Sequence, residues 1–235
     1  MKLPWDGILL PGDFMNNIPI FMSQGGTATL ILQEIPHKRT AYILLRTTLP
    51  ESLQLMIDEC AAFCRDCGAE HCFVAAPEHD TALPGPRTHT ILRMTVNKSS
   101  LPLQQEPFFL KPITPDNDSI YQRIYNRCFQ QVSNAVTYDR AQIQRIYREK
   151  QQAFLALTPD STPCGIGELH GNVLAAVGLL PEYRGHGRDL VLELLQHCPG
   201  PEITLTVASD NPAALKIYQS LGFTVTGTES VWYRC

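Results

Sequence analysis

A glycine-rich turn between a predicted strand and a predicted helix reads Pro181-Glu182-Tyr183-Arg184-Gly185-His186-Gly187-Arg188-Asp189. The apolar run Val173–Leu180 precedes it, and an uninterrupted run of this length is typical of a strand buried on both faces. Apolar residues at helical spacing follow it, namely Leu190, Val191, Leu194 and Leu195. Because glycine leaves the backbone uncovered, the first N–H groups of this helix can surround an anion such as a pyrophosphate.

A glycine-rich turn alone is a weak indication, because many strand-to-helix turns use glycine for steric reasons. A second motif follows one predicted strand later, which covers residues 202–207. Its residues are Asn211 and Pro212, which suit the start of a helix, Tyr218 within that helix, and Gly222-Phe223 at its end. The two motifs in this order are much more specific than either one.

The order of strand, glycine-rich turn, helix, strand, Asn-capped helix and Gly-Phe strand resembles the GNAT (GCN5-related N-acetyltransferase) superfamily, over about residues 108–235. The resemblance implies an α/β fold in which helices flank a mixed central sheet. It also implies an acyltransferase that uses acetyl-CoA as its co-substrate, and no metal is expected in this chemistry.

The resemblance assigns cofactor-binding roles where the residues match. Backbone groups of the strand at Val177, Gly178 and Leu179 would pair with the pantetheine arm of CoA, and Asn211 would help to hold the cofactor. The pyrophosphate would lie on Arg184, Gly185, His186, Gly187, Arg188, Asp189 and Leu190. Asp189 departs from the family, which usually has Gly or Ala there. Its carboxylate would weaken CoA binding unless it turns away or pairs with Arg188.

The family also places a tyrosine, here Tyr218, close to the thioester sulfur. A phenol has a pKa of about 10 and can protonate the leaving thiolate near neutral pH; the alternative is an aromatic residue that only packs one helix face. The incoming ammonium must lose a proton to a base, yet residues 173–180 contain no Glu or Asp. Glu168 and His170 are the nearest titratable candidates, although both are more typical of solvated hairpin residues, and bulk solvent is the alternative base.

The acceptor is expected to be an amine, either of a small molecule or of a peptide N-terminus or lysine. In the family, the segment between the first two strands shapes the acceptor pocket. This segment contains Tyr121, Tyr125, Gln130, Tyr138 and Tyr147, for each of which a packing role is the simpler interpretation. It has no acidic run that would indicate a polyamine or a histone tail.

Composition limits the function classes. The chain has 235 residues, 44% of them hydrophobic, and a formal net charge of −4, which argues against electrostatic binding of nucleic acid. No stretch approaches the ~18 apolar residues of a membrane span, and the N-terminal apolar run is broken by Pro11 and Asp13. We therefore expect a soluble cytoplasmic protein that does not bind membranes, whose eight cysteines are thiols. The sequence does not indicate an oligomeric state.

Four cysteines have a spacing that suggests a metal site: Cys60, Cys64, Cys67 and Cys72. The first three have the spacing of a radical S-adenosylmethionine loop, and all four could bind zinc. The first three also continue an i, i+3/i+4 apolar pattern along a predicted helix over 51–68, which favours thiols buried on a packed helix face.

The N-terminal part repeats the same order of elements without the motifs. Strands are predicted over 27–34, 40–47, 71–76 and 88–96, with the helix over 51–68 between the second and the third. We therefore predict two GNAT-like lobes in tandem: a degenerate lobe over 1–100 without a CoA site, a linker over 101–107 and a catalytic domain over 108–235. An unrelated α/β accessory domain is the alternative for the first lobe.

These observations together predict an acetyl-CoA-dependent N-acetyltransferase in which the acceptor amine attacks the thioester directly. One alternative is a catalytically weak acyl-CoA-binding sensor or scaffold protein, which Asp189 and the missing strand carboxylate favour. Another is a cysteine-metal regulatory module fused to a transferase.

Overall fold

The structure is a computed structural model that describes residues 19–75, 83–103 and 108–235. Several predicted segments lie partly outside these residues: the N-terminal stretch before residue 19, the end of the strand predicted over 71–76, the loop over 77–86 and the linker over 101–107. The described chain forms two compact units. One contains residues up to Leu92 together with 208–210 and 228–235, and the other contains 93–207 and 211–227. Strands β5 (Arg87–Asn97) and β11 (Thr224–Arg234) contribute residues to both units, and the predicted lobe boundaries stay a prediction.

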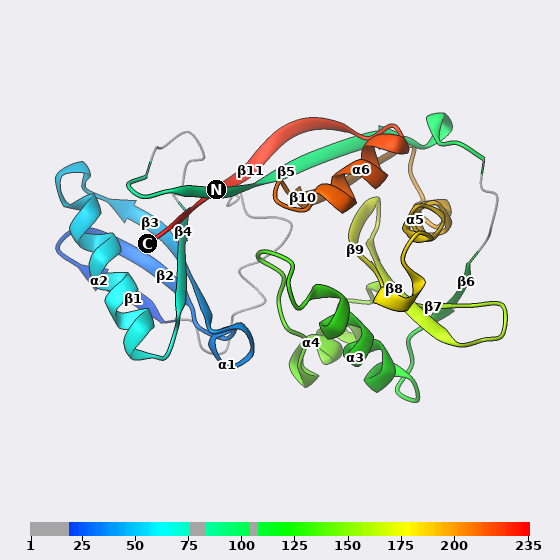
Figure 1. Cartoon of the computed structure of the whole chain (residues 1–235), viewed down its shortest axis with the longest axis horizontal. Coiled ribbons are helices and arrows are strands. Elements are labelled where there is room, and N and C mark those ends of the chain that lie inside the picture. The colour runs from blue at the N-terminus through cyan, green and yellow to red at the C-terminus, as the bar shows by residue number, and fades with distance from the viewer. Residues whose placement is uncertain (1–18, 76–82, 104–107) are drawn as a thin grey trace. The chain divides into compact units, whose positions relative to one another are not determined.

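The first unit is built on the strand order β1-β2-β3-β4-β11 (Figure 1). Its elements are β1 (Ile20–Ser23), β2 (Gly26–Ile31), α1 (Ile35–Lys38), β3 (Thr40–Thr48), the 3-10 helix η2 (Pro50–Ser52), α2 (Leu53–Asp66), β4 (His71–Ala75) and parts of β5 and β11. Strands β1, β2 and β3 are antiparallel, whereas β3 and β4 are parallel and are joined by α2. The end of β11 pairs antiparallel with β4.

One apolar face of α2 covers this sheet. Met56, Ile57, Cys60 and Cys64 of α2 share a buried cluster with residues of β2, β3 and β4. This confirms the predicted apolar helix face with one correction: Cys67 is exposed. The physical reason is that α2 ends at Asp66, so that Cys67 is its C-cap and no longer follows the helical periodicity.

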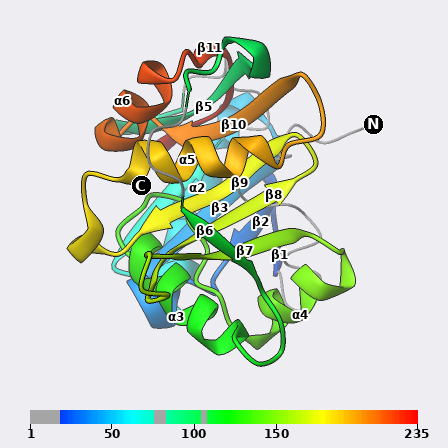
Figure 2. The same cartoon turned by 90° about the vertical axis from the view of Figure 1, so that its right-hand side faces the viewer.

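The second unit has the strand order β5-β10-β9-β8-β7-β6 (Figure 2). Its elements are η3 (Lys98–Ser100), β6 (Phe109–Pro112), α3 (Asp118–Phe129), α4 (Arg140–Arg148), β7 (Gln152–Leu157), β8 (Pro163–His170), β9 (Val173–Leu179), η4 (Pro181–Tyr183), α5 (Gly187–Gln196), β10 (Glu202–Ala208), α6 (Pro212–Ser220) and the remaining parts of β5 and β11. Strands β6 to β9 are antiparallel, and β9 and β10 are parallel. This arrangement confirms the predicted α/β fold with helices on a mixed sheet.

Helices α3 and α5 cover opposite faces of β8 and β9. A Cβ at Gly167 of β8 would meet Leu194 of α5, whereas a Cβ at Gly178 of β9 would meet Cys128 of α3. Gly167 pairs with Val177, so that Gly178 points to the other face of the same pair of strands. The prediction that Val173–Leu180 is buried on both faces is wrong, because Val173 is exposed and Ala175, Val177 and Leu179 are only half-buried.

Candidate functional site

Strand β9 separates from β10 after a short stretch of parallel pairing. The two strands pair only at Thr204 with Val173 and at Leu205 with Leu174. On its other edge, β9 stays paired with β8 as far as Leu179. Among the described strands, the β10-facing edge of β9 therefore has no partner from Ala175 to Leu179. Backbone groups on such an edge can accept an extended ligand as if it were another strand.

A β-bulge marks the point of separation. Glu168 of β8 pairs with Ala176, but the next residue, Leu169, pairs with Leu174, so that Ala175 is the extra residue in β9. A bulge bends its strand and increases the local twist, which here turns β9 away from β10. The predicted pantetheine-binding residues Val177, Gly178 and Leu179 all follow this bulge.

The glycine-rich turn is a strand-to-helix junction, as predicted. Gly185 has a φ of +105°, which side chains rarely tolerate, and His186 is the N-cap of α5. A Cβ at Gly187 would lie 3.0 Å from Cδ1 of Ile217, so that this glycine lets α5 approach α6 closely. The first N–H groups of α5 have no partner within the helix, and together with the positive end of the helix dipole such groups can bind an anion.

The structure places the other residues of this motif around the same helix start. Arg184 is exposed, Arg188 is half-buried and Leu190 is fully buried beneath the first turn. Asp189 lies in that first turn and is half-buried. Within the described residues it forms no ion pair with Arg188, so that its carboxylate adds negative charge at the helix start.

Helix α6 begins at the predicted cap. The Asn211 side chain accepts a hydrogen bond from the backbone N–H of Ala214 at 3.2 Å. Its amide oxygen therefore satisfies one N–H of the first turn, which leaves its amide nitrogen to point elsewhere. This geometry agrees with the sequence prediction for the helix start.

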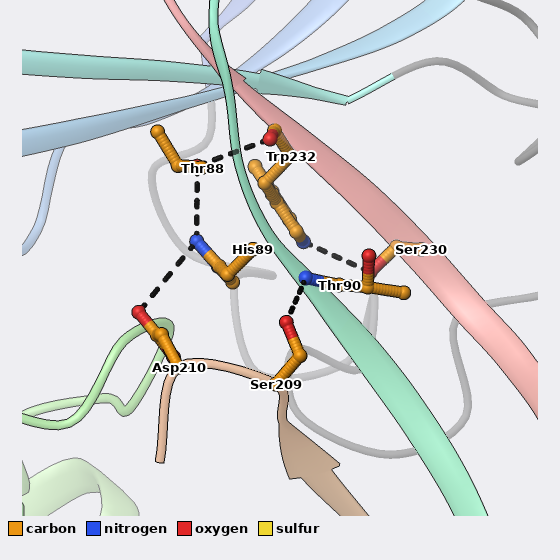
Figure 3. A network of polar contacts seen from close by, with 7 residues as sticks. All are labelled: Thr88, His89, Thr90, Ser209, Asp210, Ser230 and Trp232. Atoms are coloured by element: carbon orange, nitrogen blue, oxygen red, sulfur yellow. Dashed lines mark hydrogen bonds and ion pairs between the residues drawn. The ribbon is translucent and has the colours of Figure 1, made fainter. Parts of the chain in front are cut away.

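The two residues before Asn211 are held by β5, and Figure 3 shows this network. Ser209 exchanges two hydrogen bonds with Thr90, because its N–H donates to the Thr90 carbonyl at 2.8 Å and its Oγ accepts from the Thr90 N–H at 2.9 Å. Asp210 lies 4.0 Å from Nδ1 of the buried His89, whose ring stacks on Trp232. Sequence reasoning missed this network, because its members come from three separate segments of the chain.

Tyr218 is 8% exposed and its ring packs edge-on against Phe223, with ring centroids 5.8 Å apart. Burial raises the pKa of Tyr218 to about 12. Its hydroxyl makes no hydrogen bond to any described residue. The hydroxyl therefore stays protonated through the neutral range and is available as a donor.

Glu168 lies at the centre of a buried hydrogen-bond cluster. The Tyr121 hydroxyl donates to its Oε1 at 2.6 Å, and the Tyr138 hydroxyl lies 3.0 Å from each of its two oxygens. Glu168 is 2% exposed, so that the prediction of a solvated hairpin residue is wrong. Its side chain points to the face of β8 that α3 covers, where it contacts Tyr121 of α3.

Burial raises the pKa of Glu168, and the hydrogen bonds from Tyr121 and Tyr138 oppose that rise only in part. Burial also raises the pKa of each tyrosine, and the Glu168 carboxylate adds to the effect. The two phenols consequently remain donors while the carboxylate titrates. A carboxyl group with a raised pKa can accept a proton near neutral pH.

His170 follows two residues later on β8 and is half-buried. Its Nε2 atom is buried and has no hydrogen-bond partner among the described residues. Burial, and after it the positive charge of Arg145, lowers the pKa of His170, so that the ring is neutral at pH 7. The Arg145 charge also acts on Glu168. Glu168 and His170 thus lie on one side of the strand and share an electrostatic environment. Tyr218 belongs to a separate element, α6, and the described structure shows no hydrogen bond from it to either residue.

No group of three or more His, Cys, Asp or Glu side chains is placed to hold a metal ion within residues 19–75, 83–103 and 108–235. Over the same ranges, no helix is both long enough and apolar enough to cross a membrane.

Comparisons with known proteins agree with this geometry. A family model described as "Acetyltransferase (GNAT) domain" matches residues 116–232. A 60-residue segment is 43% identical to the N-alpha-acetyltransferase RimI of Mycobacterium tuberculosis. This match covers 25% of this chain and 38% of that relative. The chain therefore matches well under half the length of this curated relative.

Solved structures share the fold at low sequence identity. A protein of unknown function from Staphylococcus epidermidis is 12% identical and has a TM-score of 0.58, and the match covers 95% of this chain and 96% of that one. A GCN5-related N-acetyltransferase from Sphaerobacter thermophilus is also 12% identical, with a TM-score of 0.56, over 89% of this chain and 76% of that one. Together with the matched family model, these likenesses show that the C-terminal part of this chain is a domain of the GNAT acetyltransferase superfamily.

Proposed function

We propose that this protein transfers an acetyl group from acetyl-CoA to an amine, and that the amine attacks the thioester directly. The observation that carries the proposal is the edge of β9 from Ala175 to Leu179, which pairs with no described strand and leads towards the helix start at Gly187. The edge suits the extended pantetheine arm, and the helix start suits the pyrophosphate.

Each side chain of the site has a distinct role in this proposal. Glu168 or His170 removes a proton from the acceptor ammonium, directly or through water, because an amine is a nucleophile only after deprotonation. Tyr218 donates a proton or a hydrogen bond to the leaving sulfur, since its raised pKa keeps the hydroxyl protonated. Binding both substrates in one orientation lowers the entropic part of the barrier.

A peptide α-amine is the first acceptor class to test, because the RimI relative is named as an N-alpha-acetyltransferase. Lysine side chains and small-molecule amines are the other classes. The aromatic cluster around Glu168 supports an amine acceptor in general, since a buried carboxylate and phenol rings favour a cation.

The alternative function is an acyl-CoA-binding sensor or scaffold that transfers little or nothing. Asp189 favours it, because a carboxylate in the first turn of α5 opposes the binding of a pyrophosphate. Tight acetyl-CoA binding without transfer to a panel of peptides and amines would support this alternative.

We further propose that the first unit is a degenerate lobe without a CoA site. Both units contain an antiparallel pair of strands followed by a parallel crossover, through α2 in the first and α5 in the second. In the first unit, however, β3 and β4 stay paired over five positions, from Thr40 with His71 to Leu44 with Ala75. The turn before α2 is Pro50–Ser52 and contains no glycine. A binding stoichiometry of two acetyl-CoA per chain in calorimetry would contradict this proposal.

Thermal unfolding with and without acetyl-CoA tests the cofactor site. A ligand present at about a hundred times its Kd stabilises the folded state by ~2.7 kcal/mol, which raises the midpoint by several degrees. We expect Gly187→Glu to abolish this shift. Gly227→Glu is the matched control, because a Cβ at Gly227 meets no atom within 4 Å.

Arg188→Glu separates loss of binding from misfolding, since it changes the charge at the same helix start without placing a side chain against Ile217. A ligand-induced shift that survives in Gly187→Glu and in Arg188→Glu would place acetyl-CoA elsewhere. No shift in the unaltered protein would remove the cofactor from the proposal.

A further inference from the structure

Four thiols gather in the core of the first unit, which contains none of the residues proposed for acetyl transfer. Cys60 and Cys64 lie on the buried face of α2, and Cys72 lies on β4 and is 2% exposed. Cys235, which directly follows β11, packs against the same core and is half-buried. We call these four residues the thiol cluster. Cys67 is not a member, since it is exposed at the end of α2.

Cys72 and Cys235 lie directly opposite each other on neighbouring antiparallel strands. The register of β4 and β11 pairs Trp232 with Ala75 and Arg234 with Phe73, and the Cys235 N–H continues it by donating to the Cys72 carbonyl at 3.1 Å. Opposite residues that share such a hydrogen bond have Cα atoms about 5.5 Å apart, and their side chains point to the same face. A disulfide requires Cα atoms about 4.4 to 6.8 Å apart, and the typical spacing of such a pair lies within this range.

The surroundings favour a thiolate on Cys72. The Cys64 thiol donates a hydrogen bond to its sulfur and Arg65 adds positive charge, and against the effect of burial these lower the pKa of Cys72 to about 7. The same hydrogen bond raises the pKa of Cys64, because Cys64 is its donor. Burial, and after it the Cys72 charge, raises the pKa of Cys235 to about 12, although Arg65 opposes this. Cys72 is thus the more acidic thiol of the opposed pair.

Two further observations limit what this cluster can do. The described residues contain no group of three or more His, Cys, Asp or Glu side chains placed to hold a metal ion. All eight cysteines are free thiols in the structure, so that the pair is in its reduced form. Two opposed thiols in this form can be oxidised to a disulfide.

We propose that Cys72 and Cys235 are an oxidation site, at which a small hydroperoxide produces a reversible disulfide between β4 and the residue after β11. In the first step the Cys72 thiolate attacks one oxygen of the hydroperoxide. An S–O bond forms as the O–O bond breaks, so that the sulfur is oxidised to a sulfenic acid. The other oxygen leaves as an alkoxide or hydroxide, which takes up a proton. In the second step the Cys235 sulfur displaces the hydroxyl group from Cys72, and water leaves. Two thiols and one hydroperoxide thus give one disulfide, one alcohol or water, and one further water.

The test uses the whole folded protein treated with hydrogen peroxide, after which the remaining thiols are blocked with N-ethylmaleimide. We expect intact-mass measurement of a treated sample without the block to show the loss of two hydrogen atoms. Digestion of the blocked sample without reductant should give a linked pair of peptides that contain Cys72 and Cys235. Dithiothreitol should separate them. The oxidised protein should also unfold at a higher temperature than the reduced protein, because the link closes a long loop.

Cys235→Ser is the decisive variant, since this position borders solvent and the substitution leaves the buried core intact. We expect it to lose the linked peptides and to keep the circular dichroism spectrum of the unaltered protein. Cys67→Ser is the matched control and should keep the linked peptides. The proposal is overturned if no link forms in the unaltered protein, if the link joins Cys72 to Cys64, or if Cys67→Ser also abolishes it.

Discussion

The Tyr121 hydroxyl donates a hydrogen bond of 2.6 Å to Oε1 of Glu168, and both side chains are almost completely buried. The bond stabilises the charged form of Glu168, whereas burial destabilises it, and burial has the larger effect on the pKa. This balance makes Glu168 the strongest candidate for the base, and it can be tested by kinetics.

We expect Glu168→Gln to lower kcat/KM about 10²- to 10⁴-fold, the usual contribution of a general base. In the unaltered enzyme, activity should rise with pH as the Glu168 carboxyl loses its proton, at a pH above the usual range of glutamate. The variant should lack this limb of the pH profile. His170→Ala is the parallel variant, and unchanged profiles in both would assign proton removal to solvent.

Tyr138→Phe tests the same cluster without removing the carboxylate. Without the Tyr138 hydrogen bond the charged form of Glu168 is less favoured, so that the pKa of Glu168 rises further. The rise of activity with pH should then occur at a higher pH. A residue with only a packing role would lower activity equally at every pH. The measurement is kcat/KM across the pH range for the variant and the unaltered enzyme.

Glu168 also makes the stability depend on pH. Because its folded pKa is raised above its unfolded value, its contribution to stability is fully present below the ordinary glutamate pKa and is lost as the pH rises through the folded pKa. The midpoint of thermal unfolding in Glu168→Gln should therefore fall less over this range than that of the unaltered protein. If the unfolding midpoints of the two proteins changed equally with pH, the pKa of Glu168 would not be raised in the folded state.

Tyr218→Phe removes a hydroxyl that has no hydrogen-bond partner among the described residues. We expect the unfolding midpoint to change little, because the ring and its contact with Phe223 remain. In contrast, kcat should fall about 10²-fold if the hydroxyl protonates the leaving sulfur. Tyr233→Phe, in the other unit, is the control for the loss of a phenol group, and an equal loss of activity in both variants would contradict the proposed role of Tyr218.

The periodic elements could be predicted from the sequence because their patterns are local. Residues 40–47 and the helix around Met56 and Cys60 were predicted from apolar spacing alone, and β3 and α2 confirm them. The glycine-rich turn and the Asn211 cap were also predicted, because glycine and asparagine mark particular backbone conformations.

The features that were missed depend on distant parts of the chain. Glu168 is buried by tyrosines 47 and 30 residues earlier in the sequence, and no local pattern marks such a partner. The bulge at Ala175 lies in an apolar run without glycine or proline next to it. Cys235 joins the thiol cluster only because β11 pairs with β4, which the spacing of the other cysteines cannot show.

Asn211→Ala separates the structural role of this residue from binding. The loss of its hydrogen bond to the Ala214 N–H should lower the free energy of unfolding by about 1 kcal/mol. Asn211→Asp should keep the cap, because an aspartate oxygen also accepts from the helix N–H groups. If Asn211 holds CoA only by fixing the helix, acetyl-CoA affinity in calorimetry should be preserved in Asn211→Asp and reduced in Asn211→Ala.

The charge of Asp189 is expected to stabilise the fold and to weaken the binding of acetyl-CoA. In the first turn of α5 its charge interacts favourably with the helix dipole, so that Asp189→Asn should lower the free energy of unfolding by about 0.3 to 1 kcal/mol. The same charge repels a pyrophosphate at the helix start, and its removal should increase the affinity for acetyl-CoA about five-fold, which corresponds to ~1 kcal/mol. Salt at about 1 M shortens the screening length to about 3 Å and should reduce the difference in affinity. Equal affinities at low salt would show that the Asp189 carboxylate points away from the bound phosphates, and would remove the main argument for a weak acyl-CoA sensor.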